Sequence, residues 1–141
     1  MALASSVAHA DVTLSVLIDT NPETIASFDA VSKAYSEKRP DVTFDVEQRA
    51  GGSEGDNIVK TRLSTQDMTD MFNYNSGSLF QALKPEQNLQ PLTDEAFVKT
   101  TDKAFLPSVS ANKAVYGAPF GSAFGGGILY NKKVYEKLGL E

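Results

Sequence analysis

Three groups of residues in this sequence carry side chains that could bind or transform a small molecule. The run GGSEG at residues 51–55 matches the G-x-S-x-G pattern of hydrolases, in which a serine on a sharp strand-to-helix turn is the nucleophile. Short polar side chains follow two segments that are predicted to be strands, and a glycine-rich stretch spans residues 117–127. Each group predicts a different chemistry, which depends on the elements that position it.

The serine of the first group, Ser53, needs a base to take its proton, and that base is most often a histidine held by a carboxylate. The only histidine of the sequence is His9, which lies in an alanine-rich start far upstream of the serine. A catalytic triad cannot close within these residues. We therefore favour a flexible glycine-rich turn and expect no enzyme, and we keep a secreted serine hydrolase that uses Ser53 as the alternative.

The glycine-rich stretch 117–127 resembles a phosphate-binding loop only superficially. It lacks the Gly-Lys-Ser/Thr ending, and a predicted strand follows it rather than the start of a helix. Two interpretations remain open: a loop whose missing Cβ atoms let a ligand approach the backbone, or a turn with a demanding conformation. The first interpretation makes Gly121, Ser122 and Phe124 candidate binding residues.

Polar side chains follow two predicted strands, 12–18 and 70–74, at the point where each strand ends. In an open α/β sheet, ligands bind outside the carboxyl ends of the strands. Carboxylate, amide and hydroxyl groups beside an aromatic ring suit a neutral sugar, because its hydroxyls form hydrogen bonds and its C–H face packs on the ring. Helix capping could explain several of these residues singly. The candidate ligand-binding residues are Asp19, Asn21, Tyr74, Asn75, Ser76, Gly121, Ser122 and Phe124.

The segments around these groups alternate between strand and helix patterns. Residues 12–18 are apolar on both faces, which is typical of a strand inside a parallel sheet, whereas 42–47 alternate and indicate a strand nearer an edge. Asn21-Pro22 predicts a helix start. The remaining expected elements are helices 22–38, 56–64, 79–83 (ended by Pro85) and 132–138 (ended by Gly139), a helical turn at Phe97 and Val98 capped by Thr93 or Asp94, and strands 70–74, 114–119 and 128–131. This order predicts an α/β fold with helices flanking a mainly parallel sheet.

Composition narrows the function classes. The chain has 141 residues, of which 41% are hydrophobic and 22% charged, values typical of a globular domain. A net charge of −5 and a pI near 4.9 argue against nucleic acid and anionic membranes as partners. There are no cysteines, no EF-hand spacing and no histidine cluster, so we expect neither a metal site nor a cofactor.

The first ten residues indicate export. They contain no acidic or basic side chain other than His9, and they end in Ala-His-Ala, the small-x-small pattern that precedes a signal-peptidase cut. We interpret residues 1–10 as the tail of a truncated signal peptide. An exported chain without cysteine is expected in the periplasm.

Two motifs near the end of the chain, VYGAPF at 115–120 and LYNKKVYEKLGL at 129–140, resemble the K-x-Y-G-x-P … Y-N-K … F-E-K-x-G-L signature of bacterial extracellular solute-binding proteins. The similarity is to the sugar-binding group that includes maltose-binding protein. Residues 73–80 and 88–94 are similar to the third strand and the L-x-P-L-T-D loop of that family. The chain departs from the family in lacking tryptophan and in having Asn112 where relatives carry glycine in a left-handed turn.

This resemblance implies the fold and the partners of the protein. The implied fold is a periplasmic-binding-protein type II-like lobe, and residues 11–141 are expected to be the N-terminal portion of lobe 1 of a two-lobe protein. The expected function is that of the substrate-binding component of an ATP-driven carbohydrate importer, which holds a sugar between the lobes. Hinge closure on the sugar is what ABC permease transmembrane subunits recognise. A variant of this hypothesis gives the same fold a polyamine, iron or anion ligand.

Overall fold

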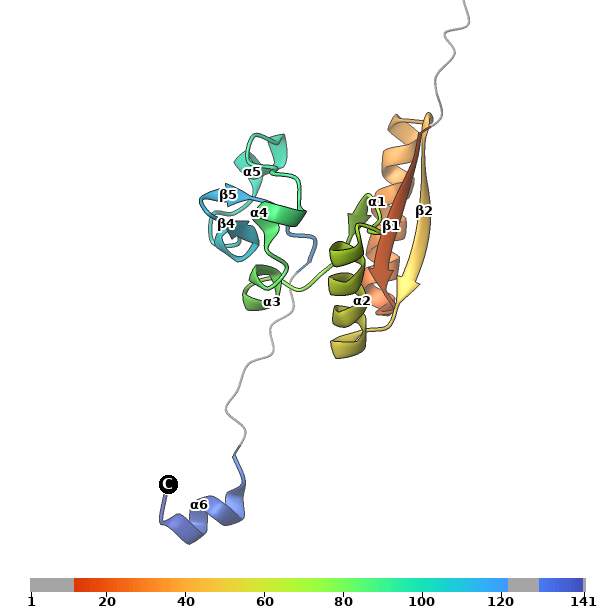
Figure 1. The fold of residues 1–141 in the computed structure, drawn as a ribbon. Coiled ribbons are helices and arrows are strands. Elements are labelled where there is room, and N and C mark those ends of the chain that lie inside the picture. The colour runs from red at the N-terminus through yellow and green to blue at the C-terminus, as the bar shows by residue number, and fades with distance from the viewer. Residues whose placement is uncertain (1–11, 122–129, 141) are drawn as a thin grey trace, which may run out of the picture.

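Three parallel strands in the order β2-β1-β3 form the centre of the fold (Figure 1). The structure, a computed structural model, describes residues 12–121 and 130–140. β1 (Val12–Asp19) pairs with β2 (Val42–Arg49) along its whole length, but with β3 (Met71–Phe72) at only two positions. The predictions of a central first strand and an edge second strand are therefore confirmed.

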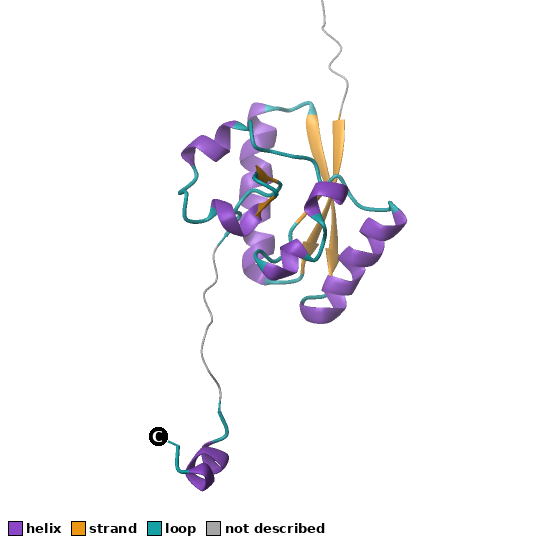
Figure 2. Ribbon diagram, turned by 60° about the vertical axis from the view of Figure 1, so that its left-hand side comes forward, coloured by secondary structure: helices purple, strands orange, loops and turns teal. Residues whose placement is uncertain are grey.

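Helices α1 (Pro22–Lys38) and α2 (Gly52–Thr65) cover opposite faces of this sheet. Successive side chains of a strand point to opposite faces, and Val16 and Ile18 pack with Phe28 of α1 while Leu17 packs with Val59 of α2. The predicted start of α1 is confirmed, because the Asn21 side chain accepts a hydrogen bond from the Glu23 N–H at 2.8 Å. Figure 2 shows the two helices flanking the strands.

Two elements differ in length from their predictions. α2 begins at Gly52 rather than at residue 56, because the glycine-rich run forms its first turn. β3 covers only Met71–Phe72 of the predicted 70–74. Side chains replace the ladder on both sides: Asp70 accepts hydrogen bonds from the N–H and hydroxyl of Ser15, at 2.8 and 2.7 Å, and the Asn73 side chain bonds to Asp19.

A second group of short elements follows the sheet (Figure 1), and its buried apolar residues include Phe80, Leu83, Val109, Ala111 and Val115. Leu83, from a turn in this group, is buried with Leu17 and Val59 and so joins the group to the α2 face of the sheet. The predicted helix 79–83 is shorter than expected, and Pro85 begins the next helix. The elements are α3 (Ser78–Gln81), α4 (Pro85–Asn88), α5 (Ala96–Thr100), the 3-10 helix η1 (Leu106–Val109), β4 (Ser110–Ala111) and β5 (Ala114–Val115).

The predicted strand 114–119 is wrong in extent, because β5 covers only Ala114–Val115. β5 pairs antiparallel with β4 in a hairpin, because Asn112 and Lys113 both adopt left-handed φ values, 46° and 69°, as a two-residue type I′ turn requires. The left-handed conformation expected of Asn112 is confirmed. The expected cap of α5 is not formed: Glu95 precedes that helix, and the Thr93 hydroxyl accepts from the Val115 N–H at 3.0 Å.

Helix α6 (Lys132–Leu138) has the predicted bounds, with the Asn131 side chain as its cap and Gly139 left-handed after its end. Of the predicted strand 128–131, residues 128–129 lie outside the described residues, and Tyr130 and Asn131 are not in a strand. In the part of the chain that the structure describes, no helix has the length and hydrophobicity to span a membrane.

Candidate functional site

The carboxyl ends of the strands bring polar side chains from distant parts of the sequence to one edge of the sheet. The arrow tips of β1 and β2 point to the edge at which α1 and α2 begin (Figure 1). The loop after β1 leads to α1 on one face, and the segment after β3 leads to the α2 face, so the crossovers diverge between β1 and β3. Such a switch point is where open α/β sheets bind ligands. We call the following set the rim: Asp19, Asn21, Arg49, Asp56, Asn73, Tyr74 and Asn75.

Asp19 and Asn73 are joined by two reciprocal hydrogen bonds. The Asp19 N–H donates to Asn73 Oδ1 at 2.9 Å, and Asn73 Nδ2 donates to Asp19 Oδ2 at 2.7 Å. The Asn21 N–H donates to the other carboxylate oxygen, Oδ1, at 3.0 Å. Each carboxylate oxygen can accept about two hydrogen bonds. The carboxylate is therefore fixed in orientation and retains acceptor capacity.

The surroundings of Asp19 keep it ionised. Partial burial disfavours the charged carboxylate, but hydrogen bonds from Asn73, Asn21 and Thr24 and the positive charge of Arg49 outweigh that effect and lower the pKa of Asp19. A carboxylate that stays charged is an acceptor for hydroxyl groups at all but acidic pH. The structure thus gives this predicted residue a defined chemistry.

The other predicted residues of these two loops differ in how they are used. Asn21 caps α1 through its side-chain oxygen and is exposed, so its amide NH2 group is left to donate. Asn75 is exposed and donates from Nδ2 to Asp56 Oδ1 at 3.2 Å. Ser76 is exposed and does not cap α3, whose cap position is occupied by Gly77.

Tyr74 is half-buried and has the guanidinium of Arg49 over its ring, 5.9 Å from the ring centroid. The ring also lies edge-on to Phe72 at a centroid distance of 6.5 Å. One face of the tyrosine is thereby occupied, which leaves at most the other face for a ligand. The aromatic surface that Tyr74 can offer to a ligand is therefore smaller than the sequence suggested.

The hydroxyl of Tyr74 is buried without a hydrogen-bond partner among the described residues. Burial raises the pKa of Tyr74, and the nearby Asp56 carboxylate adds to the increase without meeting the geometry of a hydrogen bond. Buried polar atoms without partners are rare. In the described residues only two side-chain atoms are in this state, the Tyr74 hydroxyl and Arg49 Nε, and both belong to the rim.

The GGSEG run has a structural explanation. A Cβ atom on Gly55 would lie 1.8 Å from the Ala50 carbonyl oxygen and 2.5 Å from an Arg49 guanidinium nitrogen, so only glycine fits there. Gly52 has a left-handed φ of 67°. Ser53 is exposed in the first turn of α2 and has no hydrogen-bond partner among the described residues. The run therefore lets α2 start close against the end of β2.

The predicted residues of the glycine-rich stretch are only partly described. Gly121 is exposed, with nothing within 4 Å of a Cβ built on it. Ser122 and Phe124 lie outside the described residues, so their predicted contribution stays a prediction. Over residues 12–121 and 130–140, no three His, Cys, Asp or Glu side chains are grouped closely enough to hold a metal ion.

Sequence reasoning missed three members of the rim: Arg49, Asp56 and Asn73. Asn73 interrupts an apolar strand pattern, which was a usable signal of a special role. Arg49 follows the predicted strand 42–47, where the sequence indicates an ordinary exposed charge. Asp56 is the first residue of the predicted helix 56–64, where an acidic side chain is common. Their roles depend on contacts between residues that are 19 to 54 positions apart.

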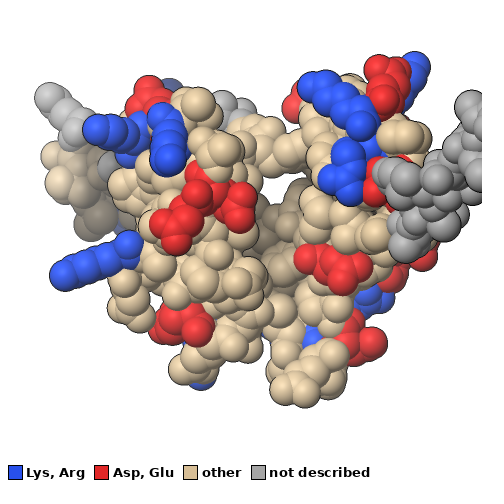
Figure 3. Space-filling model, turned by 90° about the horizontal axis from the view of Figure 1, so that it is seen from above, with Lys and Arg blue, Asp and Glu red and all other residues tan. Residues whose placement is uncertain are grey.

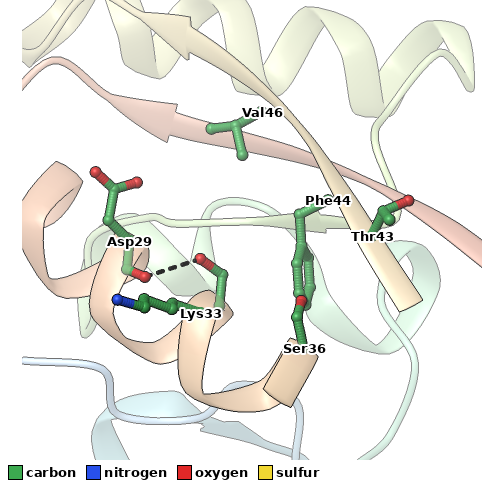
Figure 4. A pocket seen from close by; sticks show the side chains of 7 residues that line it. Asp29, Lys33, Ser36, Thr43, Phe44 and Val46 are labelled. Atoms are coloured by element: carbon green, nitrogen blue, oxygen red, sulfur yellow. Dashed lines mark hydrogen bonds between the residues drawn. The ribbon is translucent and has the colours of Figure 1, made fainter. Parts of the chain in front are cut away.

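A hollow lies between α1 and the outer edge of β2, away from the rim (Figure 4). Its two serine hydroxyls are used locally: Ser32 donates to the Asp29 carbonyl at 3.1 Å and Ser36 to the Val42 carbonyl at 3.2 Å. The Thr43 hydroxyl lies 3.0 Å from that of Thr13 on the neighbouring strand. We call this hollow the outer groove; its residues are Asp29, Ser32, Lys33, Ser36, Thr43, Phe44 and Val46. On the face of the molecule that Figure 3 shows, charged side chains of both signs are interspersed.

Comparison with known proteins identifies similar chains. A family model described as bacterial extracellular solute-binding protein matches residues 20–141. The apo form of RafE from Streptococcus pneumoniae is 18% identical over 94% of this chain, with a TM-score of 0.60. An ABC substrate-binding protein from Listeria monocytogenes in complex with cycloalternan is 19% identical over 92%, also with a TM-score of 0.60. A sugar transporter from Rhizobium etli in an open conformation is 17% identical over 92%, with a TM-score of 0.59.

At these identities the structural likeness concerns the fold. It confirms the predicted α/β lobe of the type II periplasmic-binding-protein kind, with a parallel sheet and flanking helices. This chain spans 33% of the RafE chain and 34% of each of the other two, about a third of their length. Among curated proteins, none matches this chain.

Proposed function

Because the chain belongs to the family of bacterial extracellular solute-binding proteins, we propose that it binds a neutral sugar or oligosaccharide for an ATP-driven importer. In this proposal the rim forms one wall of a cleft between two lobes, and residues 12–140 contribute to the first lobe. Closure of the lobes on the sugar would generate the form that the transmembrane permease recognises, on the outer side of the cytoplasmic membrane. The family consists of binding proteins, and no chemical role is assigned to Ser53.

The observation that carries this proposal is the reciprocal pairing of Asp19 with Asn73 at the switch point of the sheet. It fixes an ionised carboxylate against Asn73, the residue that precedes Tyr74 and Asn75 in the chain. Sugar hydroxyls would donate to Asp19 and Asn75, and the C–H face of a sugar ring would pack on the free face of Tyr74. This combination of acceptors and one aromatic face suits an uncharged polyol.

The structures of similar proteins support a sugar as the ligand. RafE has been solved with raffinose, another similar chain with mannotriose, and the Listeria protein with cycloalternan. All three ligands are neutral oligosaccharides. The chemistry of the rim in this chain is compatible with ligands of that class.

Titration calorimetry on the intact protein tests the proposal. Raffinose and mannotriose are the probes, and spermidine and inorganic phosphate are charged decoys. Saturable binding of a neutral saccharide, with no heat from the decoys, is the expected result. Binding of only a charged decoy would contradict the sugar ligand and leave the binding-protein role intact.

A further inference from the structure

Arg49 carries a buried positive charge, and the packing of the fold does not by itself require a charged side chain at this position. It is the last residue of β2, and only 6% of it is exposed. Charged side chains are almost never buried unless they are paired. The other buried charged residue in the described part of the chain, Asp41, has such a partner: the Arg39 guanidinium binds its two carboxylate oxygens at 2.9 and 2.7 Å.

No carboxylate of the described residues lies within 4.0 Å of the Arg49 guanidinium. The guanidinium donates instead to two main-chain carbonyls, that of Ala50 at 3.1 Å and that of Asn73 at 2.9 Å. Its Nε atom is buried and has no partner among the described residues. Removing a charge from water carries a desolvation cost, and no carboxylate of the described residues pairs with Arg49 to offset it. The cost of burying Arg49 therefore points to a role other than stability.

The bond to Asn73 connects strands that are not neighbours. β2 and β3 lie on opposite sides of β1. The Arg49 side chain therefore reaches past the end of the central strand to the residue that follows β3. β3 is only two residues long, and its ladder cannot fix the loop that follows. Asn73 is instead held at three points: its N–H by the Leu17 carbonyl, its side chain by Asp19 and its carbonyl by Arg49.

The same guanidinium lies over the Tyr74 ring, and the position is shaped for it. The missing Cβ of Gly55 leaves room for the nearest guanidinium nitrogen, which a Cβ atom would approach to 2.5 Å. A planar fork can donate to two carbonyls while its face covers an aromatic ring, whereas the point charge of a lysine cannot. The chemistry of this position therefore requires arginine.

We propose that Arg49 is a positioning residue of the rim: it orients the Tyr74 ring and the Asn73–Asn75 segment for the ligand without touching the ligand. This inference rests on the proposed function for its effect on sugar binding. The orientation of Tyr74, however, can be measured in the absence of any ligand. The two parts of the inference can therefore be tested separately.

The test uses the intact protein labelled with 3-fluorotyrosine, in which the Tyr74 19F signal is assigned by its loss in Tyr74→Phe. Arg49→Lys and Arg49→Met are compared with the control variant Arg62→Lys. Arg62 lies on the surface of α2 and pairs with Glu47 of β2. We expect both Arg49 variants to shift the Tyr74 signal and to weaken binding of raffinose or mannotriose at least tenfold, at a melting temperature close to that of the unmodified protein. Arg62→Lys should change neither the signal nor the affinity.

Three outcomes overturn the inference: an unmoved Tyr74 signal, a shifted signal with unchanged affinity, or an affinity loss that only follows a loss of folded protein. If the unmodified protein binds neither sugar, the proposed function fails, and the 19F shift alone decides whether Arg49 orients Tyr74. If neither variant folds, the Arg49 Nε proton of the unmodified protein is followed by NMR instead. A sugar that binds the unmodified protein should shift that proton, and a bound sugar that leaves the signal unmoved overturns the inference.

Discussion

The rim and the outer groove lie beside the same sheet, but their polar groups are used in different ways. In the rim, hydrogen bonds join residues 54, 24 and 19 positions apart. In the outer groove, Ser32 and Ser36 bond to carbonyls only 3 and 6 positions away, and Thr43 bonds to Thr13 on the neighbouring strand. The two unpartnered buried side-chain atoms of the described residues lie in the rim. Unsatisfied atoms within a network of long-range polar contacts therefore distinguish the rim from the outer groove.

The largest expected effect is that of Tyr74→Ala on sugar binding. An aromatic anchor at the centre of an interface typically contributes about 2 kcal/mol or more, so affinity should fall at least about 30-fold. The counterpart in the outer groove is Phe44→Ala, which removes a ring that packs against Phe28 and Tyr35. Calorimetry should find the affinity of the folded Phe44→Ala protein unchanged. Equal losses in both variants would erase the distinction between rim and groove.

A smaller effect is expected for Asn75→Ala. Asn75 is exposed and already shares its amide with Asp56, so one hydrogen bond to a sugar is worth about 1 kcal/mol, or about 5-fold in affinity. Asn57→Ala, on the exposed surface of α2, is the matched control and should bind normally. The same calorimetric titration measures both variants, and normal binding by Asn75→Ala would remove this residue from the site.

Acid should weaken binding through Asp19. The folded-state pKa of this group lies below its ordinary value of 3.8, so its stabilising interactions are fully present above that value. They are lost as pH falls through the lower, folded-state pKa. Below about pH 4, the melting temperature and the sugar affinity of the unmodified protein should therefore fall. Both should fall less steeply in Asp19→Asn, because asparagine does not titrate. The control is Asp45→Asn on the exposed edge of β2, which should keep the pH profile of the unmodified protein. A flattened profile like that of Asp19→Asn in this control would refute the assignment of the pH dependence to Asp19.

The smallest effect is expected for Thr43→Ala in the outer groove. Thr43 is exposed, and its hydroxyl bonds only to Thr13 on the same surface and to the Val12 carbonyl at the limit of 3.5 Å. Exposed substitutions of this kind usually change stability by about 0.5 kcal/mol or less. Thermal unfolding and calorimetry should both match the unmodified protein, whereas a clear loss of sugar affinity would move the site to the groove.

Local features of the fold could be predicted from the sequence. The cap and proline at Asn21-Pro22, the apolar run of β1 and Gly139 each act within a few residues, and all three are confirmed. The hairpin at Asn112-Lys113 was missed in part because Lys113 carries no signal of a left-handed conformation. β3 was overestimated because the side chains of Asp70 and Asn73 replace ladder bonds, which no periodicity reveals.

The candidate site was predictable in position but not in composition. Open α/β sheets bind ligands beyond their strand ends, and this general rule together with the strand patterns is enough to predict Asp19, Tyr74 and Asn75 at one edge. Arg49 reaches the rim only because Gly55, in the first turn of α2, leaves room for a guanidinium. Such contacts depend on tertiary packing, and a single sequence does not encode them in any short pattern.

Mapping the binding surface by amide chemical shifts tests the central claim most directly. Raffinose and mannotriose are titrated into the 15N-labelled intact protein, and the shift of every assigned backbone amide is followed. We predict the largest changes at residues 19–21 and 73–76 within this chain, with those of 29–36 and 43–46 unmoved. Saturable shifts confined to the outer groove, or binding that leaves 19–21 and 73–76 unchanged, would contradict the account.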